Sequence, residues 1–225
     1  DQGNGFLNEK SFAVIQPLVQ RATAIVLGPG LGQNPETLEF IQALIQSVSV
    51  PLVLDADGLN LISKNPSILR QAASKEIVIT PHPGEMGRLA NQTNELVQKD
   101  RFGVAEAFAV KHQVTVVLKG ARTVIAHPIP IPSKNPEDSQ METFCFSVNA
   151  LAGHPGMATA GCGDVLSGII GALLARKLAA KDAACAGVFL HALAGDRAMP
   201  QTGGGIAGDL IEALPQSLRC FGLLR

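Results

Sequence analysis

Four short, uniformly apolar segments recur along the chain, and a glycine-rich or polar motif follows each of them. They span residues 24–28, 51–55, 77–80 and 114–118. The segments are mostly aliphatic and β-branched and show no polar alternation, which is typical of strands that are covered on both faces of a parallel sheet. Stretches with helical spacing separate them, as in chains whose strands are joined by crossover helices. The sequence therefore predicts an α/β fold with a mostly parallel central sheet.

The remaining segments show where the helices and the main excursion are expected. Apolar residues recur at helical spacing over residues 36–47, 95–112, 182–199 and 206–214. Another helix pattern begins beside Asp164. Residues 126–139 instead contain alternating prolines, which would remove hydrogen-bond donors from a central strand, so we expect an exposed hairpin excursion there. No repeat or linker divides the chain, and residues 1–225 are predicted to form a single domain.

Composition narrows the class of protein. The 225 residues are 46% hydrophobic and 16% charged, which suits one large domain with a substantial core. The formal net charge is −1 and lysine and arginine form no cluster, which argues against binding to nucleic acid or to an acidic membrane surface. The apolar run after Asp164 breaks at Arg176, too early to span a bilayer, and the N-terminus lacks a signal-peptide pattern. We expect a soluble, cytoplasmic protein.

Cysteine usage supports the same location. The four cysteines lie far apart and form no Cys-x-x-Cys pair: Cys145, Cys162, Cys185 and Cys220. This spacing signals neither a zinc site nor a disulfide framework. Free thiols in a reducing compartment are the simpler interpretation.

The most informative motif is the glycine-rich stretch Gly153–Asp164, which runs directly into a long apolar helix pattern. Gly161 and Gly163 allow the backbone to approach an anion closely, and the first N–H groups of a helix have no partners within it. A carboxylate beside an anion pocket is repulsive unless it removes a proton or works with a metal. The motif predicts phosphoryl transfer, with Gly161, Cys162 and Gly163 as the anion hole and Asp164 as the general base. The alternative is that Asp164 only caps the helix.

Polar motifs follow the carboxyl ends of all four predicted strands. They are Gly28–Gly32, Asp55–Asp57, Thr80–Glu85 and Lys119–Thr123. Ligands bind outside these strand ends in open parallel sheets, so we expect the four motifs along one rim. Asp55 and Asp57 could be turn formers, or with Glu85 they could hold Mg²⁺ or its water molecules, and we favour an indirect role. Lys119 suits a phosphate contact, although a surface charge is an alternative.

Five motifs together resemble one family. They are Gly28–Gly32, Leu54–Asn60, Thr80–Glu85, Lys119-Gly120 with Thr123, and Gly156–Asp164. Their order and spacing are similar to those of the ADP/ATP-dependent NAD(P)H-hydrate dehydratases, the YjeF C-terminal type of the ribokinase-like superfamily. The resemblance implies a three-layer α/β/α domain that repairs hydrated nicotinamide cofactor. In that reaction the S epimer of NADHX or NADPHX is dehydrated to NADH or NADPH at the expense of ADP or ATP, through phosphorylation of the hydroxyl and loss of phosphate.

The resemblance also implies roles for particular residues. Gly30, His82 and Asp164 would contact the hydrated cofactor. Gly163 would contact the nucleotide together with one loop, namely Lys119, Gly120, Ala121, Arg122 and Thr123. ADP is the expected donor and ATP the alternative, with Mg²⁺ and an indirect metal role for Glu85. The resemblance further implies a homo-oligomer, a tetramer in particular, and fusion or partnership with an NAD(P)HX epimerase. Taken alone, His82 between two prolines would more often be a rigid-turn residue.

The chain departs from the family pattern at three points. The family normally begins with an additional strand–helix–strand unit, whereas this chain begins shortly before the predicted strand at 24–28. We therefore expect an N-terminally incomplete domain with an exposed sheet edge or an incomplete site. Cys162 stands where the family usually has Thr or Ser, and a thiol is a weak hydrogen-bond donor. His154 stands where the family more often has Asn.

Two other functions stay open on these residues. A small-molecule kinase of the same superfamily, acting on hydroxyethylthiazole or a vitamin, would share the anion hole and Asp164. A phosphorylated product that accumulates without elimination would indicate such a kinase. An inactive nucleotide-binding module is suggested by the missing first unit and by Cys162, and it would bind nucleotide tightly without turnover.

Overall fold

The computed structural model describes residues 3, 5–130, 141–147, 152–202 and 205–219. In this part of the chain one sheet has the strand order β1-β2-β3-β4-β5-β6. The strands are β1 (Ile25–Leu27), β2 (Leu52–Leu54), β3 (Ile77–Ile79), β4 (Thr115–Leu118), β5 (Val124–Pro130) and β6 (Met141–Ser147). Strands β1 to β4 run parallel, and β5 and β6 add antiparallel pairings at one side. The predicted mostly parallel sheet is confirmed, and the four predicted strands agree to within one residue at each end.

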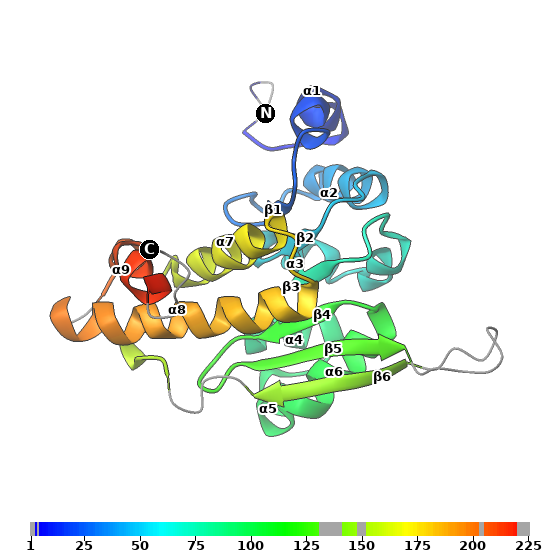
Figure 1. Ribbon diagram of the computed structural model, residues 1–225. Helices are drawn as coiled ribbons and strands as arrows, with labels where there is room; N and C mark the ends of the chain where they lie inside the picture. Colours follow the sequence, from blue (N-terminus) through cyan, green and yellow to red (C-terminus); the bar gives the residue numbers. More distant parts are fainter. Residues whose placement is uncertain (1–2, 4, 131–140, 148–151, 203–204, 220–225) are drawn as a thin grey trace.

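Helices cover both faces of this sheet (Figure 1). The helices are α1 (Glu9–Val19), α2 (Pro35–Ser47), α3 (Ala56–Ile62), α4 (Pro83–Ala90), α5 (Asn94–Lys99), α6 (Arg101–His112), α7 (Cys162–Ala175), α8 (Ala180–Thr202) and α9 (Ala207–Arg219), with short 3-10 turns η1 (Pro66–Gln71) and η3 (Pro155–Met157). Helices α2 to α6 pack on one face, and α7 and α8 pack on the other. Among the described residues, no helix combines the length and apolarity that crossing a membrane requires.

Buried side chains alternate between the two faces of the sheet. Val53, Val78 and Val117 belong to the apolar cluster under α7 and α8. Their neighbours Leu54 and Ile79 belong to the larger cluster on the other face. Successive side chains of a strand point to opposite faces of the sheet, and here helices bury both faces. This double burial explains why the strand sequences carry no polar alternation.

One predicted helix is wrong in its extent, because residues 95–112 form two helices rather than one. The break lies at Asp100, whose backbone is non-helical, with φ −139° and ψ 69°. Its carboxylate accepts a hydrogen bond of 2.9 Å from the N–H of Gly103 and so caps α6. A capping Asp competes with helix continuation because its side chain satisfies a free N–H group.

The proline-rich stretch belongs to an antiparallel hairpin of β5 and β6, as predicted, but its residues up to Pro130 are part of strand β5 rather than of an excursion. Strand β4 pairs with β5 only as far as Ala126, opposite Val116. Beyond that point the partner of β5 is β6, which pairs with Pro128 and Pro130. A proline is tolerated where a strand has a neighbour on one side only, because the missing donor is then not needed. Residues 131–139 of the predicted excursion lie outside the described residues.

Strand β1 forms one end of the sheet, since within the described residues it pairs with β2 alone. The side chain of Val26 on this strand is exposed. This agrees with the exposed edge that the sequence predicts. The missing N-terminal unit and the extent of the single domain stay predictions.

Candidate active site

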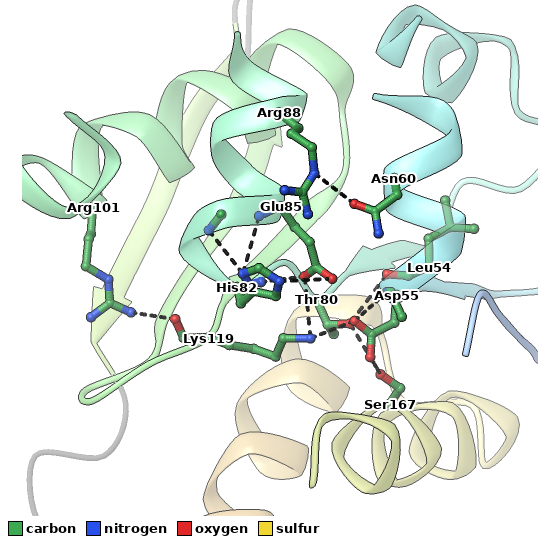
Figure 2. Close-up of polar contacts among 12 residues, drawn as sticks. Leu54, Asp55, Asn60, Thr80, His82, Glu85, Arg88, Arg101, Lys119 and Ser167 are labelled. Atoms are coloured by element: carbon green, nitrogen blue, oxygen red, sulfur yellow. Dashed lines mark hydrogen bonds and ion pairs between the residues drawn. The ribbon is translucent and has the colours of Figure 1, made fainter. Parts of the chain in front are cut away.

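Three strand ends meet the beginning of α7 at one rim of the sheet (Figure 2). Asp55 follows β2, the segment Thr80–Glu85 follows β3, and Lys119 follows β4. The fourth motif, Gly28–Gly32, lies at the same rim. The backbone of Gly28 is so close to Asp55 that a Cβ atom on Gly28 would overlap the Asp55 carbonyl oxygen. Gly28 also has a φ of +131°, which favours glycine. The predicted convergence of the strand-end motifs is therefore present in the structure.

Lys119 forms a buried ion pair at the centre of this rim. Its Nζ lies 2.7 Å from Oδ1 of Asp55 and 3.7 Å from Oε2 of Glu85. The Asp55 side chain is fully buried, and the Lys119 side chain is 19% exposed. The surface-charge alternative for Lys119 is thus excluded, because the ammonium group faces two carboxylates inside the protein. Buried carboxylates need such partners, since an unpaired buried charge is costly.

The second oxygen of Asp55 binds the helix that carries Asp164. Oγ of Ser167 donates a hydrogen bond of 2.5 Å to Oδ2 of Asp55. Thr80 Oγ1 lies 3.3 Å from the same hydroxyl. The sequence analysis missed Ser167 and Thr80. The available signal was a serine three residues after Asp164 in an otherwise apolar helix pattern, because a polar side chain that a helix buries needs a hydrogen-bond partner.

The beginning of α7 offers free backbone donors beside Lys119. Gly161 is the N-cap residue in a left-handed conformation, with φ +83°. Among the described residues, the N–H groups of Gly163 and Asp164 have no hydrogen-bond partner. A Cβ atom on Gly163 would lie 3.3 Å from the Lys119 ammonium, so the two groups are close neighbours. Unpaired N–H groups next to an ammonium form a corner rich in hydrogen-bond donors, which suits a phosphoryl group.

Asp164 lies in the first turn of α7 and is exposed. Within the described part of the chain its carboxylate makes no hydrogen bond and no ion pair. The alternative that Asp164 only caps the helix by hydrogen bonding is therefore not supported, although its charge favours the N-terminal end. A carboxylate without internal partners is free to accept a proton from a bound hydroxyl.

Cys162 offers neither an exposed thiol nor an unpaired N–H group to the predicted anion hole. Its side chain is buried in an apolar cluster with Met199 and Leu210. Burial raises the pKa of the Cys162 thiol, so the sulfur stays protonated at neutral pH. The backbone N–H donates a hydrogen bond of 3.4 Å to the Thr159 carbonyl. The Cys162 carbonyl in turn accepts a hydrogen bond of 2.9 Å from Nε2 of His191, which fixes α7 to α8.

His82 and Glu85 form a capping box at the beginning of α4. Nδ1 of His82 accepts hydrogen bonds from the N–H groups of Gly84 and Glu85, at 3.0 and 3.4 Å. Oε2 of Glu85 accepts a hydrogen bond of 2.7 Å from the His82 N–H. Burial is the main cause that lowers the pKa of His82, and Lys119 adds to it, so the ring is neutral at pH 7. His82 is thus a turn residue whose Nε2 is left for other contacts, including Glu85 Oε1 at 3.4 Å.

The three carboxylates that were considered for Mg²⁺ do not gather at one point. Asp55 faces Lys119, whereas Asp57 accepts hydrogen bonds from Gly32 N–H at 2.9 Å and from Gln33 Nε2 at 3.0 Å. Among the described residues, no group of three or more His, Cys, Asp or Glu side chains could hold a metal ion. The structure therefore does not bring Asp55, Asp57 and Glu85 together as direct ligands of one metal ion. The turn-forming alternative holds for Asp55, which caps α3 through the Ala56 N–H, whereas Asp57 fixes the distant Gly28–Gly32 loop.

An arginine that the sequence analysis missed holds the loop that follows β4. Nη1 of Arg101 donates to the carbonyl of Ala121 at 2.7 Å, and Nη2 donates to the carbonyl of Leu118 at 2.9 Å. The longer contacts reach the carbonyls of Lys119 and Arg122, at 3.2 and 3.4 Å. Burial lowers the pKa of the guanidinium, which stays charged. One side chain thus fixes most of the predicted nucleotide loop.

The remaining predicted residues lie on turns around this rim. Gly120 has a φ of +142°, and its carbonyl accepts a hydrogen bond of 3.1 Å from the buried Thr123 hydroxyl. Gly30 is exposed on the Gly28–Gly32 loop, with φ +71°. Nδ1 of His154 accepts a hydrogen bond of 3.1 Å from the Gly156 N–H and so caps η3. An Asn at that position would cap the turn similarly, so the family difference is structurally mild.

Comparison with known proteins agrees with this arrangement. A family model described as NAD(P)H-hydrate dehydratase matches residues 4–216. A bifunctional NAD(P)H-hydrate repair enzyme from Moorella thermoacetica is 40% identical over 210 residues, which are 91% of this chain and 37% of that protein. The chain therefore spans well under half of the length of this relative.

Solved structures show the same fold. The crystal structure of an ADP/ATP-dependent NAD(P)H-hydrate dehydratase from Bacillus subtilis, co-crystallised with ATP and Mg²⁺, matches with a TM-score of 0.70 at 27% identity. That match covers 88% of this chain and 65% of the other. A ribokinase-like superfamily protein from Enterococcus faecalis matches with a TM-score of 0.75 at 27% identity, covering 96% of this chain and 69% of the other. The predicted ribokinase-like α/β/α architecture is confirmed.

Proposed function

Because this chain belongs to the NAD(P)H-hydrate dehydratase family, we propose that it catalyses the nucleotide-dependent dehydration of (S)-NADHX and (S)-NADPHX to NADH and NADPH. One observation carries the proposal beyond family membership. The free N–H groups at the beginning of α7 lie beside the Lys119 ammonium, and the unpaired carboxylate of Asp164 stands at the same helix end. This corner combines an anion site with a base, which is what phosphorylation of a hydroxyl requires.

The proposed reaction has two steps. The hydrate carries a hydroxyl on the reduced nicotinamide ring, and Asp164 accepts its proton while the oxygen attacks the terminal phosphorus of the nucleotide. The bridging P–O bond of the nucleotide breaks at the same time, so that ADP leaves as AMP, or ATP as ADP. The N–H groups of Gly163 and Asp164 stabilise charge on the phosphoryl oxygens during this transfer. The ring nitrogen then donates its lone pair as the carbon–oxygen bond breaks and phosphate leaves. Loss of a proton from the neighbouring carbon restores the ring double bond.

The charges of the site explain why the nucleotide would bring a cation with it. Asp55, Glu85 and Asp164 carry three negative charges near one lysine. A di- or triphosphate would be repelled unless its own charge were reduced, and Mg²⁺ on phosphates does this while keeping several water ligands. The residues present do not fit direct coordination, since Lys119 and the His82 N–H already occupy the Glu85 carboxylate. An indirect role for Glu85, through metal-bound water, is part of the proposal.

The two substrates are proposed to lie on opposite sides of Gly163. The Lys119–Thr123 loop would bind the nucleotide, because its backbone is fixed by Arg101 and begins beside the anion corner. Gly30 and the neutral ring of His82 would face the hydrated nicotinamide together with Asp164. This assignment follows the family resemblance, and the contacts above support it by placing the β3, β4 and α7 segments together.

Several finer expectations belong to the same proposal. ADP is the proposed donor and ATP the alternative, in line with the ADP/ATP-dependent Bacillus subtilis relative. Fusion or partnership with an epimerase is suggested by the bifunctional name of the Moorella relative. A homotetrameric assembly and a cytoplasmic location stay predictions. The kinase alternative is not favoured by the family match, although the fold alone would permit it.

Replacing Asp164 tests the base assignment. Asp164→Asn should reduce kcat by about a hundredfold or more, because general-base catalysis contributes roughly that much, while ADP affinity changes little. Asp182→Asn is the matched control, since Asp182 is also exposed in the first turn of a helix, α8. Turnover is followed by the near-ultraviolet absorbance of the reduced nicotinamide, and affinity by calorimetric titration. Full activity of Asp164→Asn would rule out Asp164 as the base.

A further inference from the structure

We infer that Asp55 is a positioning residue that holds the Lys119 ammonium and the Asp164 helix in register with each other. The inference deepens the proposed function and rests on it. Asp55 touches neither proposed substrate, because its side chain is fully buried at the end of β2. Its two carboxylate oxygens instead bind two different elements, one from each side of the proposed phosphoryl position.

The geometry of Asp55 makes it the common anchor of the corner. Oδ1 accepts hydrogen bonds from Lys119 Nζ at 2.7 Å and from the Ala56 N–H at 2.8 Å. Oδ2 accepts a hydrogen bond of 2.5 Å from Ser167 on α7. The Ala56 contact caps α3, which fixes the rotation of the carboxylate. The remaining two contacts therefore set where Lys119 and α7 stand.

The donor and the acceptor of the hydrogen bond between Ser167 and Asp55 can be assigned. A carboxylate only accepts, so Ser167 must use its single proton toward Asp55. Thr80 then has its proton available for the Ser167 oxygen, at 3.3 Å, or for the Leu54 carbonyl, at 3.4 Å. The hydroxyl of Ser167 is thus held from both sides in a fully buried position. A network in which each buried polar group is satisfied defines one arrangement of its elements.

Ser167 transmits this arrangement to the base and to the anion site. It stands three residues after Asp164 and four residues after Gly163, so the three lie along one side of α7. Asp55 also binds Lys119 Nζ, which lies close to where a Cβ atom on Gly163 would stand. The contacts therefore form a closed series. Asp55 binds both Lys119 and Ser167, Ser167 lies on α7, and Gly163 of α7 is next to Lys119. Without the Asp55 charge, Glu85 at 3.7 Å would be the carboxylate left to the ammonium.

Paired substitutions distinguish positioning from simple structural support. Asp55→Asn keeps the size and the helix cap but removes the charge, and Ser167→Ala removes the link to α7. Each should lower kcat/KM by about tenfold, in part through kcat and in part through a lower affinity for ADP, because Lys119 and the beginning of α7 would both be misaligned toward the nucleotide. In a double-mutant cycle, Asp55→Asn combined with Lys119→Met should lose less than the product of the two single losses, since both remove the Asp55–Lys119 ion pair while only Asp55→Asn also affects the link to α7.

Two matched variants control for the loss of a cap or of a buried hydroxyl. Asn8→Ala removes the side-chain cap of another helix, α1, and Ser217→Ala removes a fully buried serine hydroxyl that bonds within α9. Both should keep kcat/KM within about twofold of the wild type, as expected for sites distant from the chemistry. Melting temperatures of all variants separate loss of alignment from loss of folding. Either of two results would overturn the inference. One is a wild-type kcat/KM in Asp55→Asn, and the other is a double variant whose loss equals the product of the losses in Asp55→Asn and Lys119→Met.

The inference can fail independently of the proposed function. ADP affinity, measured by calorimetry on the same variants, gives a second cycle that does not depend on turnover. If the wild type turns over hydrate and the Asp55–Lys119 coupling is absent, the positioning role is wrong and the function stands. If the wild type shows no turnover but ADP affinity shows the coupling, the function is wrong and Asp55 still positions Lys119. Absence of coupling in the ADP titrations of such an inactive protein would reject both.

Discussion

Gly28 is the residue whose replacement should disturb the site most without touching a substrate. A Cβ atom there would overlap the Asp55 carbonyl, and φ is +131°. We expect Gly28→Ala to lower the free energy of unfolding by roughly 3 kcal/mol or more, because both a backbone clash and an unfavourable φ are introduced. Chemical denaturation measures the change.

Gly30 provides the matched comparison at this scale. It also has a positive φ, +71°, but an added Cβ would meet nothing within 4 Å. Gly30→Ala should therefore cost about 1 kcal/mol, from the backbone conformation alone. Equal losses in the two variants would mean that the close approach of β1 and β2 does not require glycine at position 28.

The residues of the site differ in how well the sequence could predict them. Asp164 and Gly163 are recognisable because the glycine-rich motif and the helix that uses it are adjacent in the chain. The partners of Lys119 could be guessed only as members of one rim, since the sequence carries no distance between strand ends. Ser167 and Arg101 were missed because a serine in an apolar helix and an arginine after a capping Asp have common structural explanations.

At the scale of elements, the loop between β4 and β5 depends on Arg101 of α6. We expect Arg101→Gln to raise the KM for ADP by about tenfold and to change kcat less, because the four carbonyl contacts order a binding segment rather than the base. Arg101→Lys should fall between wild type and Arg101→Gln, since an ammonium keeps the charge but lacks the two-nitrogen fork.

A surface arginine provides the control for this loop experiment. Arg70 is an exposed arginine on η1, and Arg70→Gln should leave the KM for ADP unchanged. Steady-state kinetics with varied ADP supply the comparison. A fall in kcat at constant KM in Arg101→Gln would show that Arg101 does not act through nucleotide binding.

The elements themselves were predictable where one pattern dominated. The four parallel strands were located to within one residue, because burial on both faces produces a continuous apolar run, whereas β5 and β6 were not predicted as strands. The division of residues 95–112 depended on the side chain of Asp100, which periodicity cannot detect. The extension of β5 through Pro128 depended on where the neighbouring strand ends, which is a property of the sheet rather than of the segment.

For the whole molecule, two histidines with lowered pKa values, His112 and His191, predict how stability changes with pH. Burial lowers the pKa of His112 and of His191 to about 4, from an ordinary value of 6.5. Between these values the unfolded chain binds protons that the folded protein does not. The free energy of unfolding therefore rises with pH across this window. The stability that the protein has above pH 6.5 is progressively reduced as pH falls from about 6.5 toward 4. Denaturation curves recorded through this window give the slope.

Variants identify the source of that slope. His191→Gln and His112→Gln should each flatten the pH dependence between about 4 and 6.5, because each removes one group that takes up a proton only on unfolding. Each histidine contributes up to roughly 3 kcal/mol over the full window. An unchanged slope in both variants would assign the acid sensitivity to other groups.

The most direct test of the proposed function concerns the complete reaction. The protein is mixed with (S)-NADHX, Mg²⁺ and either ADP or ATP, and reduced nicotinamide absorbance and free phosphate are followed together. The account predicts that NADH and phosphate appear at equal rates, only when a nucleotide is present, and more readily with ADP. Accumulation of a phosphorylated hydrate without NADH would contradict it in favour of a kinase, and tight nucleotide binding without any product would indicate a binding module instead.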